Sequence, residues 1–362
     1  MDLETRFELV RGVGEEIITE QELRELLGTN LHPIAYDGFE PSGLAHLPFG
    51  VFRPLLLKDL IKAGVHFKLW LADSFAWINN KIGGDLNRIR KVGEYFIEVW
   101  KAAGVDEKKV EFLWASDAFS NKEYWKRVIL IAKNTTMHRA TRALTIMGRK
   151  EGELQEVAQY FYPMMQTADI FHLDADICQL GLDQRRANML ARDVAEKMKW
   201  KKPVVASHHM LMGLEGAKQP EGYEENKEMD VEISSKMSKS KPQTAIFVHD
   251  SQEEIKKKIN SAFCPEKVVE GNPVLEYSKY LIFKKFKSMK IERDKKFGGD
   301  IELDNYQELE ETFRQGKLHP VDLKNAVAMY LDQMIEPIRK HFEKDKKAKK
   351  LYEFVKKQEV TR

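Results

Sequence analysis

The feature of this sequence that most constrains its fold is a repeated order of apolar run, loop and amphipathic helix. An apolar run at 33–39 leads into a loop rich in proline and glycine, and a helical pattern follows at 51–63. A second apolar run at 66–73 precedes an amphipathic helix over 86–100, and a third run lies at 110–114. Buried strands that alternate with helices require right-handed crossovers, so the pattern predicts a doubly wound, parallel α/β sheet of the Rossmann-like kind. Ligands of such sheets bind at the carboxyl ends of the strands, which makes the loop after the first run the first candidate site.

The rest of the chain divides into segments around this sheet. Residues 1–30 have helical periodicity and predict a helical preface to the sheet domain, which we expect to span 31–250. The pattern near 120–165 is almost wholly helical, so a helical insertion is expected there. From 251 to 362 the composition changes to lysine-rich amphipathic helices, which predict a smaller, mainly helical C-terminal domain.

Composition limits the classes of protein that this chain can represent. The 59 lysine and arginine residues nearly balance 57 aspartate and glutamate residues, so the net charge of +2 does not by itself indicate a polyanionic partner. The two cysteines, Cys178 and Cys264, lie far apart, which fits a reducing compartment and argues against a structural metal. The N-terminus lacks the pattern of a secretory signal and no apolar run is long enough to span a bilayer, so we expect a cytoplasmic protein without a membrane partner.

The most specific string in the chain is Lys-Met-Ser-Lys-Ser-Lys at 236–241. Lysines with short hydroxyl residues between them can fold over a triphosphate, because their ammonium groups neutralise the charge that develops as pyrophosphate leaves. A solvated basic loop is the alternative for a short lysine string that stands alone. A second string in this chain makes a nucleotide site the better interpretation.

That second string is Tyr-Asp-Gly-Phe-Glu-Pro-Ser-Gly-Leu-Ala-His-Leu at 36–47, where the first apolar run gives way to a helix. Gly38 and Gly43 allow the backbone to approach a ligand closely. His46 lies at the start of the helix, where it can donate to a phosphate beside the positive end of the helix dipole. A lone histidine after a glycine loop is usually structural, but beside the lysine string it becomes a candidate nucleotide ligand.

Together these strings resemble the H-I-G-H and K-M-S-K-S signatures with which class I aminoacyl-tRNA synthetases bind ATP. Tyr-Pro-Met-Met-Gln at 162–166, with Asp169, and Gly-Leu-Asp-Gln-Arg at 181–185 resemble the pattern of the tyrosyl-tRNA synthetase family. Phe-Gly-Gly-Asp at 297–300 and His-Pro-Val-Asp-Leu-Lys-Asn-Ala-Val at 319–327 resemble its archaeal and eukaryotic branch. The resemblance therefore extends over nearly the whole chain.

This resemblance implies the ligation of tyrosine to tRNA. L-tyrosine would react with ATP to give tyrosyl-adenylate and pyrophosphate, and the tyrosyl group would then pass to the 3′ end of tRNA(Tyr). Residues 31–250 would form a class I catalytic domain with its K-M-S-K-S loop at 236–240, and 251–362 would bind the anticodon. Mg²⁺ would accompany ATP, two chains would form a homodimer, and positioning and electrostatics would supply the rate without a covalent enzyme intermediate.

The resemblance also assigns a tyrosine pocket. Tyr36 and Asp169 would hydrogen-bond the substrate phenol, and a pocket built this way leaves polar groups unpaired when phenylalanine enters. Asp169 lies three residues after Gln166 and seven after Tyr162, on one helical face, which favours a shared pocket over a surface carboxylate. By the same resemblance Tyr162, Gln166 and Gln184 would receive the ammonium group and orient the carboxylate.

The implied ATP site combines both strings, with His46, Lys236 and Lys239 as catalytic residues and Lys239 as the group that stabilises the transition state. This chain has Pro48 and Phe49 where the family motif has glycine and a basic or polar residue. Proline is tolerated in the first turn of a helix, so the fold can survive while the adenosine contact changes. The implied ATP ligands are Gly38, His46, Lys236, Ser238 and Lys239.

Other residues have both a functional and a structural interpretation. Asp300 resembles the residue that reads the first anticodon base, although Gly-Gly-Asp is also ordinary turn chemistry. Trp70 and Phe75 would border the tyrosine ring, or they are core aromatics. Four basic residues could meet acceptor-stem phosphates or form a solvated charged face: Lys133, Arg139, Arg142 and Arg149.

Three other functions are compatible with this fold. A tryptophanyl enzyme is disfavoured because an indole offers only a donor, whereas Tyr36 and Asp169 suit a hydroxyl. A catalytically silent paralogue that binds RNA would be expected to have lost Lys239, His46 or Gln184, and all three are present. A different nucleotidyltransferase would share the ATP strings but not the tyrosine pocket or the C-terminal strings.

Overall fold

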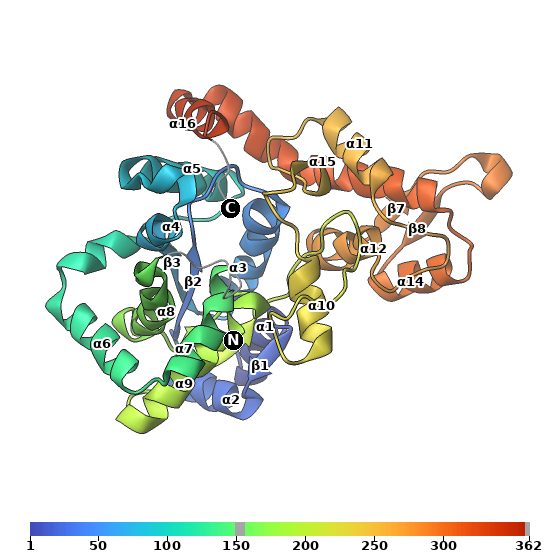
Figure 1. Cartoon of the computed structure of the whole chain (residues 1–362). Helices are drawn as coiled ribbons and strands as arrows, with labels where there is room; N and C mark the ends of the chain where they lie inside the picture. Colours follow the sequence, from blue (N-terminus) through green and yellow to red (C-terminus); the bar gives the residue numbers. More distant parts are fainter. Residues whose placement is uncertain (149–155, 359–362) are drawn as a thin grey trace.

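The computed structural model of the chain describes residues 1–148 and 156–358, and a six-stranded sheet lies at its centre (Figure 1). The strand order is β1-β6-β5-β2-β3-β4, and every neighbouring pair is parallel except β1 and β6. The doubly wound parallel sheet predicted from the sequence is therefore confirmed. The strands are β1 (Glu16–Ile18), β2 (Ile34–Phe39), β3 (His66–Leu71), β4 (Val110–Trp114), β5 (Ile177–Cys178) and β6 (Val204–Ser207).

Successive side chains of the strands point to opposite faces of the sheet and enter two separate hydrophobic clusters. Ala35 and Leu69 belong to the cluster on the face of α3 and α5, whereas Tyr36 and Trp70 belong to the cluster on the face of α6, α8 and α9. Neighbouring residues of β2 therefore meet different helices. These helices are α3 (Arg53–Lys62), α5 (Leu86–Ala102), α6 (Lys122–Lys133), α8 (Phe161–His172) and α9 (Arg185–Met198).

β2 is the strand from which the chain moves in both directions across the sheet. Through α3, α4 (Asp73–Ile78) and α5 the chain reaches β3 and β4 on one side of β2, and β5 and β6 lie on its other side. At such a switch point the loops after neighbouring strands diverge and leave a crevice outside the carboxyl ends. A ligand site is expected at the boundary between β2 and β5.

The N-terminal segment is helical as predicted, except for one strand. α1 (Leu3–Arg11) and α2 (Glu20–Thr29) flank β1, which pairs antiparallel with β6 at the edge of the sheet. A strand of three residues is too short to show an alternating pattern in the sequence. Arg6 is buried, and its guanidinium donates to the carbonyls of Ala63 (Nε–O 2.8 Å) and Leu27 (Nη1–O 2.6 Å), which ties this segment to α3.

Between β4 and β5 the described residues form α6, α7 (Met137–Ala143) and α8, with short helical turns beside them. The C-terminal part is mainly helical as well, but the predicted turn at 297–300 connects two short strands, β7 (Met289–Ile291) and β8 (Ile301–Leu303). No helix within the described ranges is both long and apolar enough to cross a membrane. The remaining helices are α10 (Lys227–Ser235), α11 (Gln252–Ser261), α12 (Pro273–Tyr277), α13 (Phe283–Lys285), α14 (Tyr306–Arg314), α15 (Pro320–Lys344) and α16 (Lys346–Lys356).

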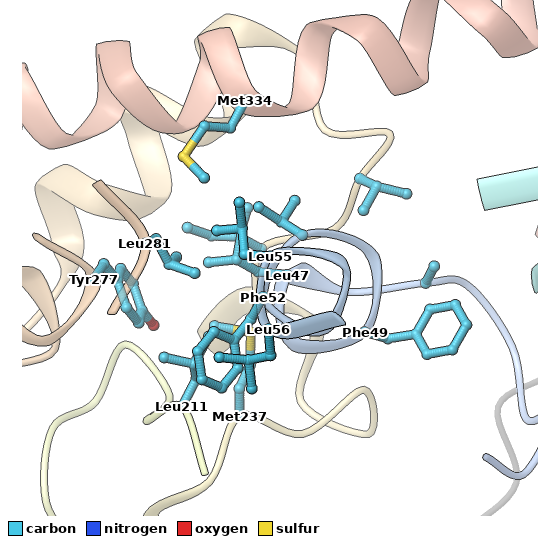
Figure 2. Packing of buried hydrophobic residues seen from close by; sticks show 14 of the residues in the cluster. Leu47, Phe49, Phe52, Leu55, Leu56, Leu211, Met237, Tyr277, Leu281 and Met334 are labelled. Carbon is cyan, nitrogen blue, oxygen red and sulfur yellow. The ribbon is translucent and has the colours of Figure 1, made fainter. Parts of the chain in front are cut away.

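The sheet and the C-terminal helices share one hydrophobic core around α3 (Figure 2). Leu56 of α3, Leu211 and Tyr277 of α12 all belong to it. Met237, in the middle of the lysine and serine string, is 4% exposed and packs in the same core. Because burial of such a side chain stabilises by about 1.5–3 kcal/mol, Met237 anchors the base of this loop.

Gly93 on α5 provides a test of how closely this helix packs on the sheet. An added Cβ would lie 2.5 Å from Cζ3 of the Trp114 ring, so the ring or the helix would have to move. We expect Gly93→Ala to lower the free energy of unfolding by about 1–3 kcal/mol, even though alanine favours a helix by about 1 kcal/mol. Thermal or urea denaturation measures the change.

Gly28→Ala on α2 is the matched control, because the added Cβ would meet Leu3 Cδ2 at an ordinary 3.7 Å. This substitution should be neutral or stabilising, since alanine restricts the unfolded chain. A Gly93→Ala protein as stable as the wild type would contradict the close packing of α5 against Trp114.

Candidate active site

A cavity of about 300 Å³ opens outside the carboxyl ends of the strands, at the boundary between β2 and β5. Residues at the ends of β2 and β3 and in the segments after β5 and β6 line it, as expected for the ligand site of such a sheet. Side chains of α8 close one wall. The sequence-predicted site residues in the lining are Tyr36, Gly38, His46, Tyr162, Gln166, Asp169, Gln184 and Lys236.

Two oxygen-bearing side chains meet at the deep end of the cavity. Tyr36 is 1% exposed, and its hydroxyl has no hydrogen-bond partner among the described residues. Asp169 accepts hydrogen bonds from the Tyr124 hydroxyl (Oδ1, 2.8 Å) and from Trp70 Nε1 (Oδ2, 3.0 Å). Each carboxylate oxygen can accept a second hydrogen bond, so this end of the cavity retains capacity for a ligand hydroxyl.

Burial sets the protonation of these groups. It raises the pKa of Asp169 to about 8, against the opposing hydrogen bonds from Tyr124 and Trp70. It also raises the pKa of Tyr36 well above its usual value, so Tyr36 keeps its proton and can donate. Trp70 belongs to the hydrophobic core and also lines the cavity, where its ring N–H donates to Asp169, and its contact with a tyrosine ring stays a prediction.

Other parts of the lining carry amide and carboxylate groups. Gln166 Nε2 donates to Gln184 Oε1 at 3.0 Å, and the Tyr162 hydroxyl donates to Glu40 Oε1 at 2.7 Å. The ring of Phe75 packs edge-on against Tyr162, with 4.7 Å between centroids. Glu40 is not among the predicted site residues, although it lies within the 36–47 string. Its carboxylate gives this part of the lining the negative charge that attracts an ammonium group.

A buried ion pair borders the cavity on the α3 side. Arg53 Nη2 lies 2.7 Å from Asp37 Oδ2 and donates to Gln179 Oε1 at 2.5 Å. Burial raises the pKa of Asp37 to about 7, and the guanidinium of Arg53 acts against this shift. No motif in the sequence indicated this pair, because the two residues lie on different elements and no string joins them.

The two ATP-type strings meet at the mouth of the cavity. Lys236 forms an ion pair with Asp183 (Nζ–Oδ2 2.6 Å), and Lys239 lies 3.4 Å from Ser42 Oγ in the first string. The Lys239 ammonium also lies over the Phe96 ring, 4.7 Å from its centroid. Burial, and then the charge of Lys81, lower the pKa of Lys239 to about 7.

His46, Ser238 and Lys239 differ in their position relative to the cavity. His46 lines the cavity, and its Nδ1 has no hydrogen-bond partner among the described residues. Burial, reinforced by Lys239 and Lys236, holds the pKa of His46 well below its usual value, so the imidazole is neutral. Ser238 and Lys239 lie in the loop outside the lining.

The departure from the family motif at Pro48 and Phe49 has a structural explanation. Pro48 begins a π-helical turn at the entrance of α3, where its missing N–H leaves no unpaired donor. Phe49 is buried, and its ring lies 4.2 Å from Phe96 and 5.6 Å from Trp100, between centroids. Both residues border the cavity, so an apolar wall stands where the motif usually has polar groups.

The basic residues predicted to meet RNA phosphates are partly paired with acids. Arg139 forms an ion pair with a carboxylate of α9, and Arg142 forms one with Glu225. Lys133 is exposed, and Arg149 lies outside the described residues. RNA phosphates would therefore have to replace carboxylates as partners of Arg139 and Arg142.

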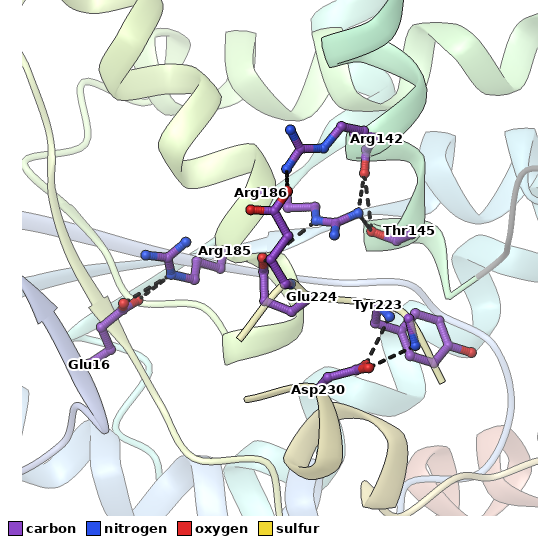
Figure 3. Close-up of polar contacts among 10 residues, drawn as sticks. Glu16, Arg142, Thr145, Arg185, Arg186, Tyr223, Glu224 and Asp230 are labelled. Carbon is purple, nitrogen blue, oxygen red and sulfur yellow. Dashed lines mark hydrogen bonds and ion pairs between the residues drawn. The ribbon is translucent and has the colours of Figure 1, made fainter. Parts of the chain in front are cut away.

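Two more arginines at the start of α9 hold neighbouring elements together (Figure 3). Arg185 Nε donates to both carboxylate oxygens of Glu16 in β1, each at 2.9 Å. Arg186 Nη1 donates to the backbone oxygen of Arg142 at 2.7 Å and to Thr145 Oγ1 at 3.2 Å. Arg185 and Arg186 therefore stabilise the fold by joining α9 to its neighbouring elements.

Asp300, the predicted anticodon residue, lies in the turn between β7 and β8, far along the chain from the cavity residues. Its Oδ1 accepts a hydrogen bond from the Arg293 backbone N–H at 3.1 Å, and its Oδ2 lies 3.0 Å from Lys290 Nζ. Phe297 in the same turn is 63% exposed. The turn therefore presents a carboxylate and an exposed ring to its surroundings.

Comparison with known proteins places the chain in a family. The model of the family described as tRNA synthetases class I (W and Y) matches residues 29–220 and 230–336. The chain is 46% identical over 364 residues to tyrosine–tRNA ligase 1, cytoplasmic, of Arabidopsis thaliana, and the match covers 100% of this chain and 90% of the plant protein.

Solved structures agree with this match. Tyrosyl-tRNA synthetase from Pyrococcus horikoshii, complexed with L-tyrosine, superposes with a TM-score of 0.89 at 41% identity, over 98% of this chain and 100% of that one. Leishmania major tyrosyl-tRNA synthetase, in complex with tyrosinol, gives a TM-score of 0.88 at 39% identity over 98% of this chain. This chain spans about half of the Leishmania chain, 52% of its length.

The family model covers enzymes for both tryptophan and tyrosine, and the high identity to tyrosine enzymes decides between them. The match extends over the sheet, the cavity loops and the C-terminal helices, so it is more than a shared fold. The chain belongs to the class I tRNA synthetases, as a tyrosine–tRNA ligase of the archaeal and eukaryotic type.

Proposed function

We propose that this tyrosine–tRNA ligase binds L-tyrosine with its phenol between Tyr36 and Asp169. The observation that carries the proposal is the buried Tyr36 hydroxyl, which has no hydrogen-bond partner among the described residues. An unpaired buried hydroxyl costs free energy, and a ligand hydroxyl placed here would remove that cost. Tyr36 would donate to the phenol oxygen, and the phenol would donate to Asp169.

In another part of the pocket, the ammonium group of tyrosine would lie against Tyr162, Gln166, Gln184 and the Glu40 carboxylate. This placement leaves the tyrosine carboxylate directed toward the mouth of the cavity, where the two ATP-type strings meet. The carboxylate oxygen would then attack the α-phosphorus of ATP, and the bond from that phosphorus to the pyrophosphate oxygen would break. Pyrophosphate would leave with the electron pair.

ATP would be held by the backbone at Gly38 and by His46, Lys236, Ser238 and Lys239. His46 would donate one N–H to a phosphate as a neutral imidazole, because burial holds its pKa low. Lys236 and Lys239 would neutralise the charge that develops on the departing pyrophosphate. The 3′-terminal hydroxyl of tRNA would then attack the carbonyl carbon of the adenylate, and AMP would leave.

Mg²⁺ would reach this site with ATP. Mg²⁺ is usually held by substrate phosphates and one or two carboxylates. The cavity lining carries four carboxylates, and those of Asp183 and Glu40 are the two that are bound neither by Arg53 nor by Tyr124 and Trp70. These donors fit the ion. When bound, it would neutralise phosphate charge as pyrophosphate leaves.

The partners in this proposal are tRNA(Tyr) and a second copy of the chain, in the cytoplasm. Residues 31–250 would act as the catalytic domain and 251–362 as the anticodon-binding domain. Trp77, Val157 and Phe161 are exposed apolar side chains, and the hydrogen bond from Asn80 to Glu156 joins the segment of Trp77 to the one that leads into Val157. Exposed apolar groups that gather in this way mark association surfaces. The cytoplasmic location in the name of the Arabidopsis relative supports the same location here.

The reaction is tested by exchange of labelled pyrophosphate into ATP with each standard amino acid, with Mg²⁺ and without tRNA. Tyrosine alone should support exchange, because only its phenol satisfies both Tyr36 and Asp169. Omission of Mg²⁺ is the control and should abolish the signal. Exchange with tryptophan or phenylalanine at a similar rate would contradict the phenol pocket, and no exchange with any amino acid would contradict the assigned ATP site.

Tyr36→Phe tests the phenol contact. The Michaelis constant for tyrosine should rise by about tenfold, which corresponds to the loss of about one hydrogen bond, and the constant for ATP should stay unchanged. The melting temperature should not fall, because the Tyr36 hydroxyl has no partner within the described fold. Steady-state exchange kinetics and thermal melting measure both quantities.

The matched control is Tyr95→Phe. The Tyr95 hydroxyl is also buried, but it accepts a hydrogen bond from the Ala45 backbone (3.2 Å) and lies 2.8 Å from His249 Nε2. This variant should lose stability and keep its Michaelis constant for tyrosine. Equal effects of the two substitutions on tyrosine binding would remove the special role of Tyr36.

Asp300→Ala tests the anticodon assignment. The Michaelis constant for tRNA(Tyr) should rise by about 5- to 150-fold, the cost of about 1–3 kcal/mol for a lost base contact, while pyrophosphate exchange stays unchanged. Asp322→Ala is the comparison, because Arg293 Nη1 donates to Lys317 O (2.9 Å) and thereby brings the start of α15 close to the same turn. If only Asp322→Ala raised the Michaelis constant for tRNA(Tyr), the base contact would have to be assigned to α15 and not to the turn.

A further inference from the structure

In the wall of the cavity, just after β6 ends, His209 lies among carboxylates from three parts of the chain. Its Nδ1 is 2.9 Å from Glu232 Oε1 on α10, and its Nε2 is 3.2 Å from Glu276 Oε1 on α12. Glu15, just before β1, lies 4.0 Å from Nδ1, and the Tyr280 ring stacks on the imidazole with 4.1 Å between centroids. These contacts are ion pairs, because neither ring nitrogen makes an aligned hydrogen bond within the described residues, and two carboxylates this close favour the charged form of the imidazole.

The electrostatic surroundings favour that cation. Burial opposes a charge on His209, but Glu232 and Glu276 outweigh this effect and raise its pKa to about 10. The adjacent His208 is neutral, because burial and the nearby Arg53 cation hold its pKa well below its usual value. His209 is therefore the positive charge that faces these carboxylates.

The same two carboxylates also hold the backbone that follows His209. Glu232 Oε1 accepts a hydrogen bond from the Met210 N–H at 2.8 Å, and Glu276 Oε1 accepts one from the Met212 N–H at 2.6 Å. The imidazole and two backbone amides thus bind the same pair of oxygens. The segment 209–212 is clamped between α10 and α12.

Backbone contacts join this clamped segment to the start of the K-M-S-K-S loop. The Met237 N–H donates to Leu211 O at 2.7 Å, and Met212 forms an antiparallel bridge with Lys236. Lys236 therefore takes its backbone position from a segment that His209 helps to hold. α10, which bears Glu232, also leads directly into this loop.

We propose that His209 is a positioning residue for adenylate formation, a cation between α10 and α12 that fixes the segment on which Lys236 is mounted. The inference rests on the proposed role of the K-M-S-K-S loop in binding ATP. Without the imidazolium, Glu232 and Glu276 would keep their backbone hydrogen bonds but lose their shared positive partner, and their mutual repulsion would loosen the contact of α10 and α12 with this segment. Lys236 would be displaced, while the phenol end of the pocket would keep its contacts.

The test is His209→Asn, which keeps a polar side chain but cannot carry the charge. In tyrosine-dependent pyrophosphate exchange, kcat/KM for ATP should fall by about 10- to 100-fold, the usual effect of a small misplacement of a reacting group. The Michaelis constant for tyrosine should change by less than about twofold, since no contact of the phenol is altered. A role in stability alone would not separate the two substrates in this way.

His66→Asn is the matched control, because His66 also pairs with a glutamate (Nε2 to Glu111 Oε2, 3.1 Å) but lies exposed on β3, away from the cavity. It should leave both substrate constants unchanged. Adding Glu276→Gln to His209→Asn should restore part of the ATP constant, because it removes an unpaired carboxylate. If His209→Asn fails to fold, Glu276→Gln alone should still impair ATP more than tyrosine.

The pH dependence of stability gives a second readout. The pKa of His209 is higher in the folded chain than its ordinary value of about 6.5, so its ion pairs stabilise fully below that pH and are lost as the pH rises through about 10. The difference in melting temperature between wild type and His209→Asn should therefore shrink from pH 7 to pH 10.

Three results would overturn the inference. The first is an equal effect of His209→Asn on the constants for ATP and tyrosine, and the second is a folded variant with unchanged constants. The third is the same defect in wild type that has been treated with a chelator and then supplied with Mg²⁺ again. The last result would mean that Glu15, His209 and Glu232, whose ligand atoms lie within 4.8 Å of one another, hold a metal ion instead. Wild type that exchanges no pyrophosphate with tyrosine would instead contradict the proposed function itself.

Discussion

The parallel pairing of β2 with both of its neighbours is the constraint on which the rest of the structure depends. Tyr36 lies opposite Lys68 in β3 and Cys178 in β5, and this register directs its ring to the face of α8. Asp37, the next residue, points to the other face and meets Arg53 of α3. A slip of one residue would exchange these two side chains, placing a carboxylate where a hydroxyl is needed.

The cavity gathers buried groups whose charged forms are disfavoured. Burial raises the pKa of Asp169 to about 8 and of Asp37 to about 7, and in the loop beside the cavity burial and the charge of Lys81 lower the pKa of Lys239 to about 7. Apolar side chains of similar size would fill the same space without this cost. Groups of this kind gather where a ligand supplies the missing partners, so their concentration at one edge of the sheet marks a binding site.

Sequence patterns predicted the parts of this structure that depend on local periodicity. Runs of apolar residues predicted the buried strands at 34–39 and 66–71 and the helical structure between them. The strings at the ends of these elements correctly indicated which edge of the sheet carries the cavity. β1 escaped prediction because three residues carry no period, and its pairing with β6 is decided by tertiary contact. The Asp37–Arg53 pair escaped because two charges on different elements leave no mark in a single sequence.

The K-M-S-K-S loop has a base that is fixed by packing and a tip whose lysine can change its binding partner. Met237 is buried in the core, so the loop base is held by packing, whereas Lys239 has weaker contacts, one of 3.4 Å with Ser42 and one with the face of Phe96. An anionic triphosphate is a stronger partner than either, and its approach raises the pKa of Lys239 from about 7. In the proposed mechanism ATP therefore brings Lys239 fully into its charged form. The loop then carries its full positive charge where phosphate charge has to be neutralised.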